Sequence, residues 1–278
     1  MEGPAAKKQK STIRPVDKEL RVQAVLINCV GHRRKTNEDN SCINEFFIPE
    51  GQMNANLCVS DERSAKSQFF GVFDGVGSDE SGEKASLAAA AFFAEHAQDY
   101  FSGFKDESRL DELFAKANQD VLERVSGSST TAVVLWIAEG AARMSNAGDS
   151  RGYLLRQGGM KQLSSEHTRA QEMLAQGLLE AGSKEFAQKS HEIIRFLGEA
   201  ETHQYWKPSH SPIFPLEHGD LFLLCSDGLT DMVSDDEILY LLQNAGDCHS
   251  AAQSLVDKAM ENGGKDNITV MLVRILLN

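Results

Sequence analysis

Short apolar runs bounded by turn residues recur along this chain, and four of them stand beside acidic residues. The four acidic pairs are Glu38-Asp39, Asp74-Gly75, Asp227-Gly228 and Asp266-Asn267. Because the end of a strand holds a side chain on a rigid support, residues at such positions can form one fixed site. Asp-Gly and Asp-Asn are also common turn formers, and a turn is the simpler interpretation of any single pair. Four pairs together favour a shared acidic site.

The apolar runs have the length and the β-branched composition of strands. They span residues 21–28, 69–73, 130–137, 143–146, 152–156, 221–225 and 268–275. The strands between residues 130 and 156 follow one another through short turns, which predicts antiparallel pairing. With helical patterns elsewhere in the chain, the sequence predicts the mixed α+β class.

Two helices are predicted between the early strands. Ser81 precedes an alanine-rich stretch that extends to Tyr100, and Ser108 precedes a second amphipathic stretch. The second half of the chain predicts another pair.

In that later pair, Ser234 and Glu237 have the spacing of a capping box. A further helix over residues 251–262 ends at Gly263, which suits a left-handed C-cap. Helices therefore come in pairs along the chain.

Charge and cysteine content limit the partners and the compartment. Acidic residues outnumber basic ones by 41 to 28, and the net charge of -13 argues against duplex nucleic acid or an anionic membrane as the main partner. Acidic surfaces are also common in proteins that bind no metal. Five cysteines without C-x-x-C spacing suit neither a disulfide framework nor a thiolate zinc site. With no secretory signal and no run of about 18 apolar residues, we expect a cytoplasmic protein.

We expect one domain. Residues 1–18 are polar, rich in lysine and without periodicity, which predicts a flexible leader. Residues 19–278 continue without a linker-like break and are expected to form that domain.

A cluster of carboxylates suits a hard cation. Mg²⁺ and Mn²⁺ prefer oxygen ligands and keep several waters, so a few carboxylates and one backbone carbonyl are sufficient. A glycine after an aspartate, as in Asp74-Gly75, lets a carbonyl approach closely.

Seven segments together resemble the successive motifs of the metal-dependent protein phosphatase (PPM) family, also called type 2C. They are RKTNED, FFGVFDGVG, SGSSTTAVV, SNAGDSRGYLL, LSSEHT, FLLCSDGLTD and GGKDNITVMLV, in family order. The similarity covers about residues 22 to 275. The segments NED, SDGLTD and DNITV are most similar to those of bacterial members. The resemblance implies a four-layer αββα sandwich of two mainly antiparallel sheets flanked by helix pairs, with a two-metal centre at one end of the sheets.

The resemblance also implies roles for individual residues. Asp74 corresponds to the carboxylate that bridges two cations, either Mn²⁺ or Mg²⁺. Asp227 and Asp266 complete one cation site, and the Gly75 carbonyl belongs to the other. Glu38 and Asp39 hold metal-bound water.

Three further residues match family positions. Arg34 matches the arginine that grips the substrate phosphate, a task that suits a planar guanidinium. Its neighbour Arg33 is the alternative to be excluded by mutation. Asp149 and Asp231 match the acidic pair that binds a third, weaker cation in many members. The implied catalytic residues are therefore Arg34, Asp39 and Asp74.

The implied reaction is direct attack on phosphorus by a metal-bridging hydroxide. Val76 stands where many eukaryotic members have the histidine that protonates the leaving oxygen, so that proton must come from another group. No histidine is assigned as a ligand, because the H-x-x-x-H spacing is absent, and His167 is expected to have a structural or surface role. Cys225 is expected to be a small buried hydrophobe.

Three functions are to be distinguished for this sequence. The first is a phosphatase acting on phosphoserine or phosphothreonine in proteins, expected to be a monomer opposed by a Ser/Thr kinase, with no nucleic acid or membrane partner. The second is a catalytically silent PPM-fold regulatory or binding module, which usually lacks metal carboxylates that this chain retains. The third is a hydrolase of small phosphoesters or nucleic acid, which requires a basic cleft or a nucleotide pocket that the sequence does not indicate. Residues 177–206 correspond to the variable flap region and do not reveal the substrate.

Overall fold

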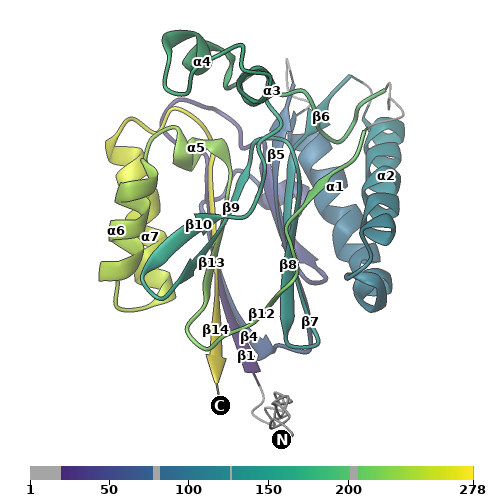
Figure 1. Ribbon diagram of the computed structural model, residues 1–278, viewed down its shortest axis with the longest axis vertical. Coiled ribbons are helices and arrows are strands. Elements are labelled where there is room, and N and C mark those ends of the chain that lie inside the picture. Colours follow the sequence, from purple (N-terminus) through teal and green to yellow (C-terminus); the bar gives the residue numbers. More distant parts are fainter. Residues whose placement is uncertain (1–19, 78–81, 126, 201–205, 278) are drawn as a thin grey trace, which may run out of the picture.

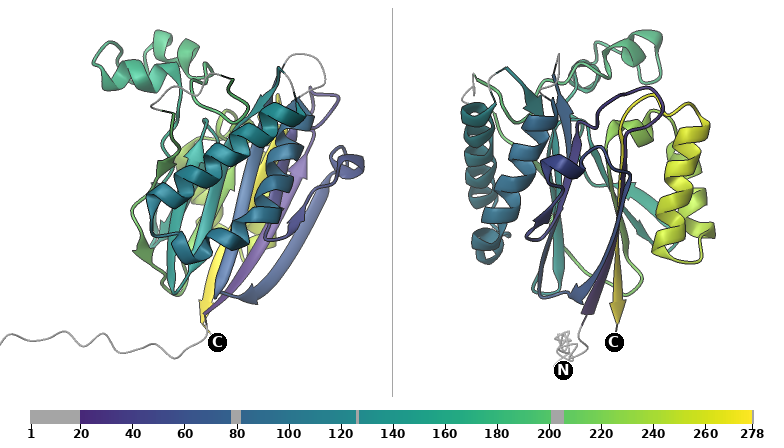
Figure 2. Two further views of the ribbon diagram at one scale, coloured as in Figure 1. Left: turned by 90° about the vertical axis from the view of Figure 1, so that its right-hand side faces the viewer. Right: turned by 180° about the vertical axis from the view of Figure 1, so that it is seen from behind.

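Two β-sheets pack face to face between two layers of helices in the computed structural model (Figure 1). The structure describes residues 20–77, 82–125, 127–200 and 206–277. The turned views in Figure 2 show the helices on the outer faces of the two sheets. This arrangement is the expected α+β sandwich.

The first sheet has six strands in the described residues, and its order is β10-β9-β13-β14-β1-β4. Their bounds are β10 (Gly159–Gln162), β9 (Arg151–Arg156), β13 (Leu221–Cys225), β14 (Ile268–Leu277), β1 (Leu20–Cys29) and β4 (Leu57–Ser64). Every neighbouring pair is antiparallel. The two ends of the described chain therefore lie side by side, as β1 and β14.

The second sheet has eight strands within the same residues, and its main order is β11-β8-β7-β5-β2-β3. Their bounds are β11 (Ser209–His210), β8 (Ala141–Ala147), β7 (Ala132–Ala138), β5 (Ser67–Val76), β2 (Asp39–Ile43) and β3 (Phe46–Phe47). Two short strands lie off this path: β12 (Phe214–Pro215) pairs with β8, and β6 (Ser129–Thr130) pairs with β5. These pairs are antiparallel as well.

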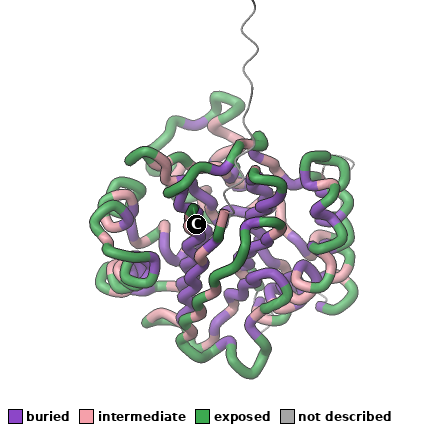
Figure 3. Tube along the Cα trace, turned by 90° about the horizontal axis from the view of Figure 1, so that it is seen from below, coloured by how far each residue is buried: buried purple, intermediate pink, exposed green. Residues whose placement is uncertain are grey.

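The central strands of each sheet, such as β7 and β13, are buried on both faces, which explains why they are continuous apolar runs. Successive side chains of a strand point to opposite faces. In β7, Trp136 packs in the core beneath the helices, whereas Leu135 packs in the core between the sheets. In β14, Leu272 and Met271 divide in the same way between the outer and the central core. Figure 3 shows buried residues along the strands and exposed residues on the outer turns.

Helices cover each outer face. The second sheet carries α1 (Gly82–His96), the 3₁₀ helix η2 (Ala97–Gly103) and α2 (Glu107–Arg124). The first sheet carries α6 (Asp235–Asn244) and α7 (Cys248–Glu261). The remaining helices are short: η1 (Glu50–Gln52), α3 (Arg169–Ala175), α4 (Lys184–Lys189) and α5 (Asp227–Thr230). In Figure 1, α3 and α4 lie above the end of the sandwich where α5 begins.

Most predicted elements are present, with specific differences. All seven predicted strands form, although the run over 130–137 divides at Thr131 into β6 and β7. The capping box of Ser234 and Glu237 is confirmed. The prediction of Ser108 as a helix start is wrong, because Asp106 is the N-cap and accepts a hydrogen bond from the Ser108 amide. The first helix ends at His96 and continues as η2.

Some predictions fall on residues outside the description or on elements that the sequence did not indicate. Residues 1–18 and Ser81 lie outside the described residues. Strands β2 and β4 were not predicted. Among the helices of the described ranges, none has both the length and the apolar character to cross a bilayer.

Candidate functional site

Asp39 and Asp74 face one another on neighbouring strands of the second sheet. They are Cα partners in the antiparallel register of β2 and β5. The expectation that Asp74 follows its strand is wrong, because β5 continues through Gly75 and Val76, which pair with β6. Thr131, between β6 and β7, holds this position. Its hydroxyl accepts a hydrogen bond from the Asp74 amide at 3.0 Å, and its amide donates to the Asp74 carbonyl at 2.8 Å.

Asp227 and Asp266 come from the first sheet. Asp227 is the first residue of α5, directly after β13, and Asp266 precedes β14. Because β13 and β14 are antiparallel neighbours, the end of one strand and the start of the other meet at the same edge. Gly228 makes this approach close: a Cβ at that position would lie 1.9 Å from the Asn267 carbonyl oxygen.

The two sheets bring these carboxylates together in one cluster. The carboxyl groups of Asp74 and Asp227 lie within hydrogen-bonding distance. Burial, and then repulsion from Asp227 and Asp266, raises the pKa of Asp39 to about 7. Burial, followed by the charges of Asp39 and Asp227, raises the pKa of Asp74 well above its ordinary value. Burial and the charges of Asp231 and Asp266 raise the pKa of Asp227 to about 6.

The repulsion among these carboxylates makes the cluster suitable for binding divalent cations. Several carboxylates have been removed from water and placed beside one another, which disfavours their charged forms. Oxygen-ligated cations such as Mn²⁺ and Mg²⁺ would relieve both penalties at once. The donor set is therefore chemically suited to the metal centre that the sequence resemblance implies.

A polar network fixes the orientation of the Asp39 side chain. The hydroxyls of Ser226 and Thr269 each donate to Asp39 Oδ2, both at 2.7 Å. Asn28 donates in turn to the Thr269 hydroxyl at 2.8 Å, and Asn37 donates to Asn28 at 2.5 Å. Sequence reasoning missed these residues. Ser226 and Thr269 could have been found from the sequence, because they are the hydroxyl residues of the SDG and DNIT segments and stand close to the acidic positions.

Gly75 lies where no larger residue fits. A Cβ on Gly75 would lie 2.2 Å from the Gly82 carbonyl oxygen and 2.6 Å from the Glu38 carbonyl oxygen. The Gly75 amide donates to that Glu38 carbonyl at 3.1 Å. The Glu38 side chain reaches the same place, because its Oε1 would lie 2.8 Å from a Cβ on Gly82. Glu38, Gly75 and the start of α1 therefore form one closely packed corner of the site.

Arg34 places a cation at the rim of the cluster. It donates from Nη1 to Glu38 at 3.0 Å and from Nη2 to Asp266 at 2.7 Å. Its side chain is 45% exposed, so the guanidinium remains accessible to a substrate phosphate. The Asn267 side chain fixes the backbone behind it, accepting from the Glu38 amide and donating to the Thr36 carbonyl. Arg33 is exposed.

Asp149 lies in the connection from β8 of the second sheet to β9 of the first, and Asp231 lies at the end of α5, which follows β13 of the first sheet. Asp149 follows β8 in a buried loop, and burial together with the charges of Asp227, Glu166 and Asp231 raises its pKa to about 8. Asp231 is the exposed C-cap of α5.

A histidine that sequence reasoning did not single out joins the cluster next to Asp231. His191, from the turn after α4, places Nδ1 3.6 Å from Asp231 Oδ2. No motif or ligand spacing in the sequence marks this residue.

Two other expectations concern residues outside the acidic cluster. Cys225 is fully buried, as expected. His167 is buried, and its Nδ1 accepts a hydrogen bond from the Gly148 amide at 3.2 Å. Burial, and secondarily the charge of Arg195, lowers the His167 pKa to about 3. These contacts agree with a structural role.

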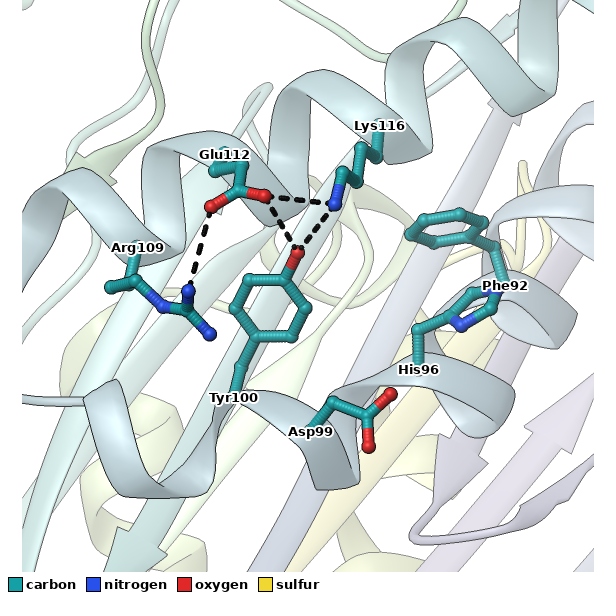
Figure 4. Close-up of a pocket in the computed structure, with 7 residues that line it drawn as sticks. All are labelled: Phe92, His96, Asp99, Tyr100, Arg109, Glu112 and Lys116. Atoms are coloured by element: carbon teal, nitrogen blue, oxygen red, sulfur yellow. Dashed lines mark hydrogen bonds and ion pairs between the residues drawn. The ribbon is translucent and has the colours of Figure 1, made fainter.

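A separate cavity of about 320 Å³ lies between α1, η2 and α2 (Figure 4). Tyr100 donates to Glu112 and accepts a hydrogen bond from Lys116 within it. The guanidinium of Arg109 lies 5.0 Å from the centre of the Tyr100 ring. None of the site residues predicted from the sequence lines this cavity.

Sequence comparisons place the chain among known phosphatases. Residues 28–173 match the family described as Protein phosphatase 2C. The serine/threonine phosphatase stp of Listeria innocua is 30% identical over 227 residues, which cover 76% of this chain and 86% of that protein. Serine/threonine protein phosphatase PstP of Mycobacterium tuberculosis is 30% identical over 225 residues, which cover 78% of this chain and 42% of PstP.

Solved structures agree with the sequence comparisons. The serine/threonine phosphatase of S. agalactiae matches with a TM-score of 0.75 and 25% identity, over 91% of this chain and 99% of that one. The catalytic domain of PstP in complex with two manganese ions matches with a TM-score of 0.71 and 28% identity, over 92% and 99% of the two chains. This chain therefore belongs to the protein phosphatase 2C family and is a protein phosphatase of the serine/threonine type.

Proposed function

We propose that the chain hydrolyses phosphoserine and phosphothreonine by direct attack of water on phosphorus, at a centre of two Mn²⁺ or Mg²⁺ ions and without a phosphoenzyme. The observation that carries this proposal is the convergence of Asp39, Asp74, Asp227 and Asp266 from two sheets. When bound, the cation pair supplies a hydroxide by lowering the pKa of water and supplies positive charge opposite the phosphate. The same fully retained acidic set argues against a catalytically silent module.

Each acidic residue has a position that suits its proposed role. Asp74 lies between Asp39 of its own sheet and Asp227 of the other sheet, so its carboxylate is suited to bridge the two cations. Asp227 and Asp266 would complete one cation site. The Gly75 carbonyl would serve the other, with Glu38 and Asp39 holding the water around the pair.

Arg34 is proposed to orient the substrate phosphate. Its planar guanidinium can donate two parallel hydrogen bonds to phosphate oxygens. Glu38 and Asp266 hold the side chain from below at 3.0 and 2.7 Å, which limits the entropy lost when phosphate binds.

Protonation of the leaving oxygen is not assigned to a side chain at position 76. Val76 is 40% exposed at the site edge and has no proton to give. We therefore propose that this proton would come from a water held at the metal centre or from another group, and that the rate depends only modestly on histidine titration. A single histidine-to-alanine change that abolished hydrolysis while all cations remained bound would contradict this assignment.

A third, weaker cation is proposed for Asp149 and Asp231. Asp149 is 6% exposed, and Asp227 and Asp231 both raise its pKa. A cation there would offset the charge of a buried carboxylate for which the structure offers no cationic partner within the described residues.

The remaining proposals concern the setting of the enzyme. Its substrates are proteins phosphorylated by an opposing Ser/Thr kinase, and nucleic acids and membranes are excluded as partners. The net charge of -13 supports that exclusion. We further propose a monomer, composed of the domain over residues 19–278 and the leader over 1–18, in the cytoplasm. The five free cysteines support a reducing compartment.

Phosphate release from a phosphothreonine peptide tests the proposal. We expect hydrolysis with Mn²⁺, none with EDTA, and a loss of at least about a thousandfold in kcat for Asp74→Asn, because one carboxylate serves both cations. Asp236→Asn, on the exposed first turn of α6, is the matched control and should retain wild-type activity. Hydrolysis that persists in EDTA, or in Asp74→Asn, would refute the two-metal mechanism.

A further inference from the structure

His191 reaches the acidic cluster from outside the two sheets. It follows α4 and lies next to α5, because its Nδ1 is 3.6 Å from Oδ2 of Asp231, the C-cap of that helix, whose first residue is Asp227. One ligand atom from each of these three residues lies within 4.8 Å of the others. Ligand atoms bound to one ion at about 2.1 Å lie at most about 4.2 Å apart, so the group needs to close by only a fraction of an ångström.

The backbone around His191 holds it at this position. The Glu192 carbonyl accepts a hydrogen bond from the Arg169 amide at 2.8 Å, and the Ile194 amide donates to the His167 carbonyl at 2.8 Å. His167 is itself joined to Gly148, because its amide donates to the Gly148 carbonyl at 3.0 Å and its Nδ1 accepts from the Gly148 amide at 3.2 Å. The residues after His191 are therefore hydrogen-bonded to residues 167–169, and His167 is in turn hydrogen-bonded to the loop that carries Asp149.

Asp149 provides an independent indication of a cation here. Asp149 is 6% exposed, its own amide donates a hydrogen bond to its carboxylate, and among the described residues no salt bridge pairs it with a cationic side chain. Its strongest charge interaction is repulsion by Asp227, and Asp231 repels it as well. A buried carboxylate among like charges requires a cation or a proton.

We infer that His191 is the nitrogen ligand of the third divalent cation proposed for Asp149 and Asp231, with Asp227 as a further ligand. The inference rests on the proposed two-metal function and goes beyond it, because it makes the segment from α3 to His191 part of the metal centre. Binding of this ion fastens that segment over the catalytic edge.

The ligand type also predicts which ion binds. Imidazole suits first-row transition metals, whereas Mg²⁺ prefers oxygen ligands and retains its water. The third site therefore accepts Mn²⁺ and discriminates against Mg²⁺, although the two proposed oxygen-ligated sites accept both ions.

Electron spin-echo envelope modulation on the Mn²⁺-loaded protein tests the inference directly. We expect the nitrogen coupling of a bound imidazole in the wild type, its loss in His191→Ala, and its loss in His191→Gln. His249→Ala, at an exposed position on α7, is the matched control and should leave the nitrogen coupling unchanged. Because the His191 side chain is 57% exposed, these variants should fold. Absence of the coupling in the wild type, or its persistence in His191→Ala, would overturn the inference.

Equilibrium dialysis and hydrogen exchange separate this inference from the proposed function. His191→Ala should bind one Mn²⁺ fewer than wild type, and Mn²⁺ should no longer slow amide exchange over α3 and α4. Asp74→Asn should instead lose the ions of the two-metal centre. Unchanged ion binding by Asp74→Asn would refute the two-metal proposal. If Asp74→Asn loses ions and His191→Ala loses none, the role of His191 is refuted and the two-metal proposal stands.

Discussion

Asp39 and Asp74 are direct cross-strand partners on β2 and β5, in a register that pairs a buried acidic position with a half-buried one. Like charges directly opposite one another destabilise a sheet. The two carboxylates therefore lower the stability of the metal-free fold when both are charged. A cation bound between them would offset their repulsion.

The raised carboxyl pKa values predict how the stability of the metal-free protein depends on pH. Burial and then neighbouring carboxylates raise the pKa to about 7 at Asp39 and about 8 at Asp149. The unfolded value is about 3.9. These groups contribute full stability below the unfolded pKa, and that contribution is lost as pH rises through the folded pKa. The free energy of unfolding in EDTA should therefore fall between pH 5 and pH 8.

Urea unfolding across that range measures this effect. For each proton that the folded state holds and the unfolded state has lost, the free energy of unfolding falls by about 1.4 kcal/mol per pH unit. Saturating Mn²⁺ should reverse the trend, because ionised carboxylates bind the cation more tightly. Asp39→Asn should flatten the curve in EDTA. A metal-free protein that gains stability from pH 5 to pH 8 would show that these carboxylates are not destabilised by charge.

Removing the hydroxyls that hold Asp39 should weaken metal binding without removing a ligand. Ser226→Ala and Thr269→Val each delete a 2.7 Å hydrogen bond to Asp39 Oδ2. Substitutions of residues that orient metal ligands commonly lower metal affinity or activity by about 10- to 100-fold. Calorimetric titration with Mn²⁺ checks this, and Ser60→Ala on the exposed edge of β4 is the control. Equal affinities in all three variants would show that Asp39 needs no such support.

Gly75→Ala should damage both the fold and the site. The new Cβ would lie 2.2 Å from the Gly82 carbonyl oxygen, which is backbone and cannot rotate away. Such overpacking costs about 1–3 kcal/mol. We expect a lower melting temperature and loss of activity. Gly51→Ala, where a Cβ meets nothing within 4 Å, should change neither property. A fully active Gly75→Ala would mean that this corner can relax.

Arg34→Lys tests recognition of phosphate by a planar fork. Lysine keeps the charge but loses the paired donors that now contact Glu38 and Asp266. Hydrogen bonds to charged groups contribute about 1.5–3 kcal/mol, so kcat/KM should fall by about 10- to 100-fold. The neighbouring Arg33→Lys should be neutral. A larger loss in Arg33→Lys than in Arg34→Lys would reassign the phosphate-binding arginine.

The sequence by itself determined the strands that are buried on both faces and the helix ends with strong local signals. β13 is apolar along its whole length and β14 is apolar except at Thr269 and Arg274, and the Ser234 capping box closes through residues three apart. The acidic positions were also readable, because each lies within a short motif.

Tertiary structure alone decided the strands whose polar sequences do not predict a strand. Strand β2 has the polar sequence DNSCI, yet all five of its residues are buried. The Asn40 side chain donates to the Ile48 carbonyl, and Asp39 accepts from Thr269 and Ser226. Strand β4 is polar because it lies at a sheet edge.

The assembly of the site was likewise decided by pairing between distant strands. The register of β13 with β14 sets Asp227 beside Asp266, and the packing of the two sheets sets Asp227 beside Asp74. His191 reaches Asp231 only because a turn after α4 is bonded to residues 167–169. Local sequence chemistry fixes what a short segment prefers, whereas distances between segments far apart in the chain depend on strand register and on the shared core.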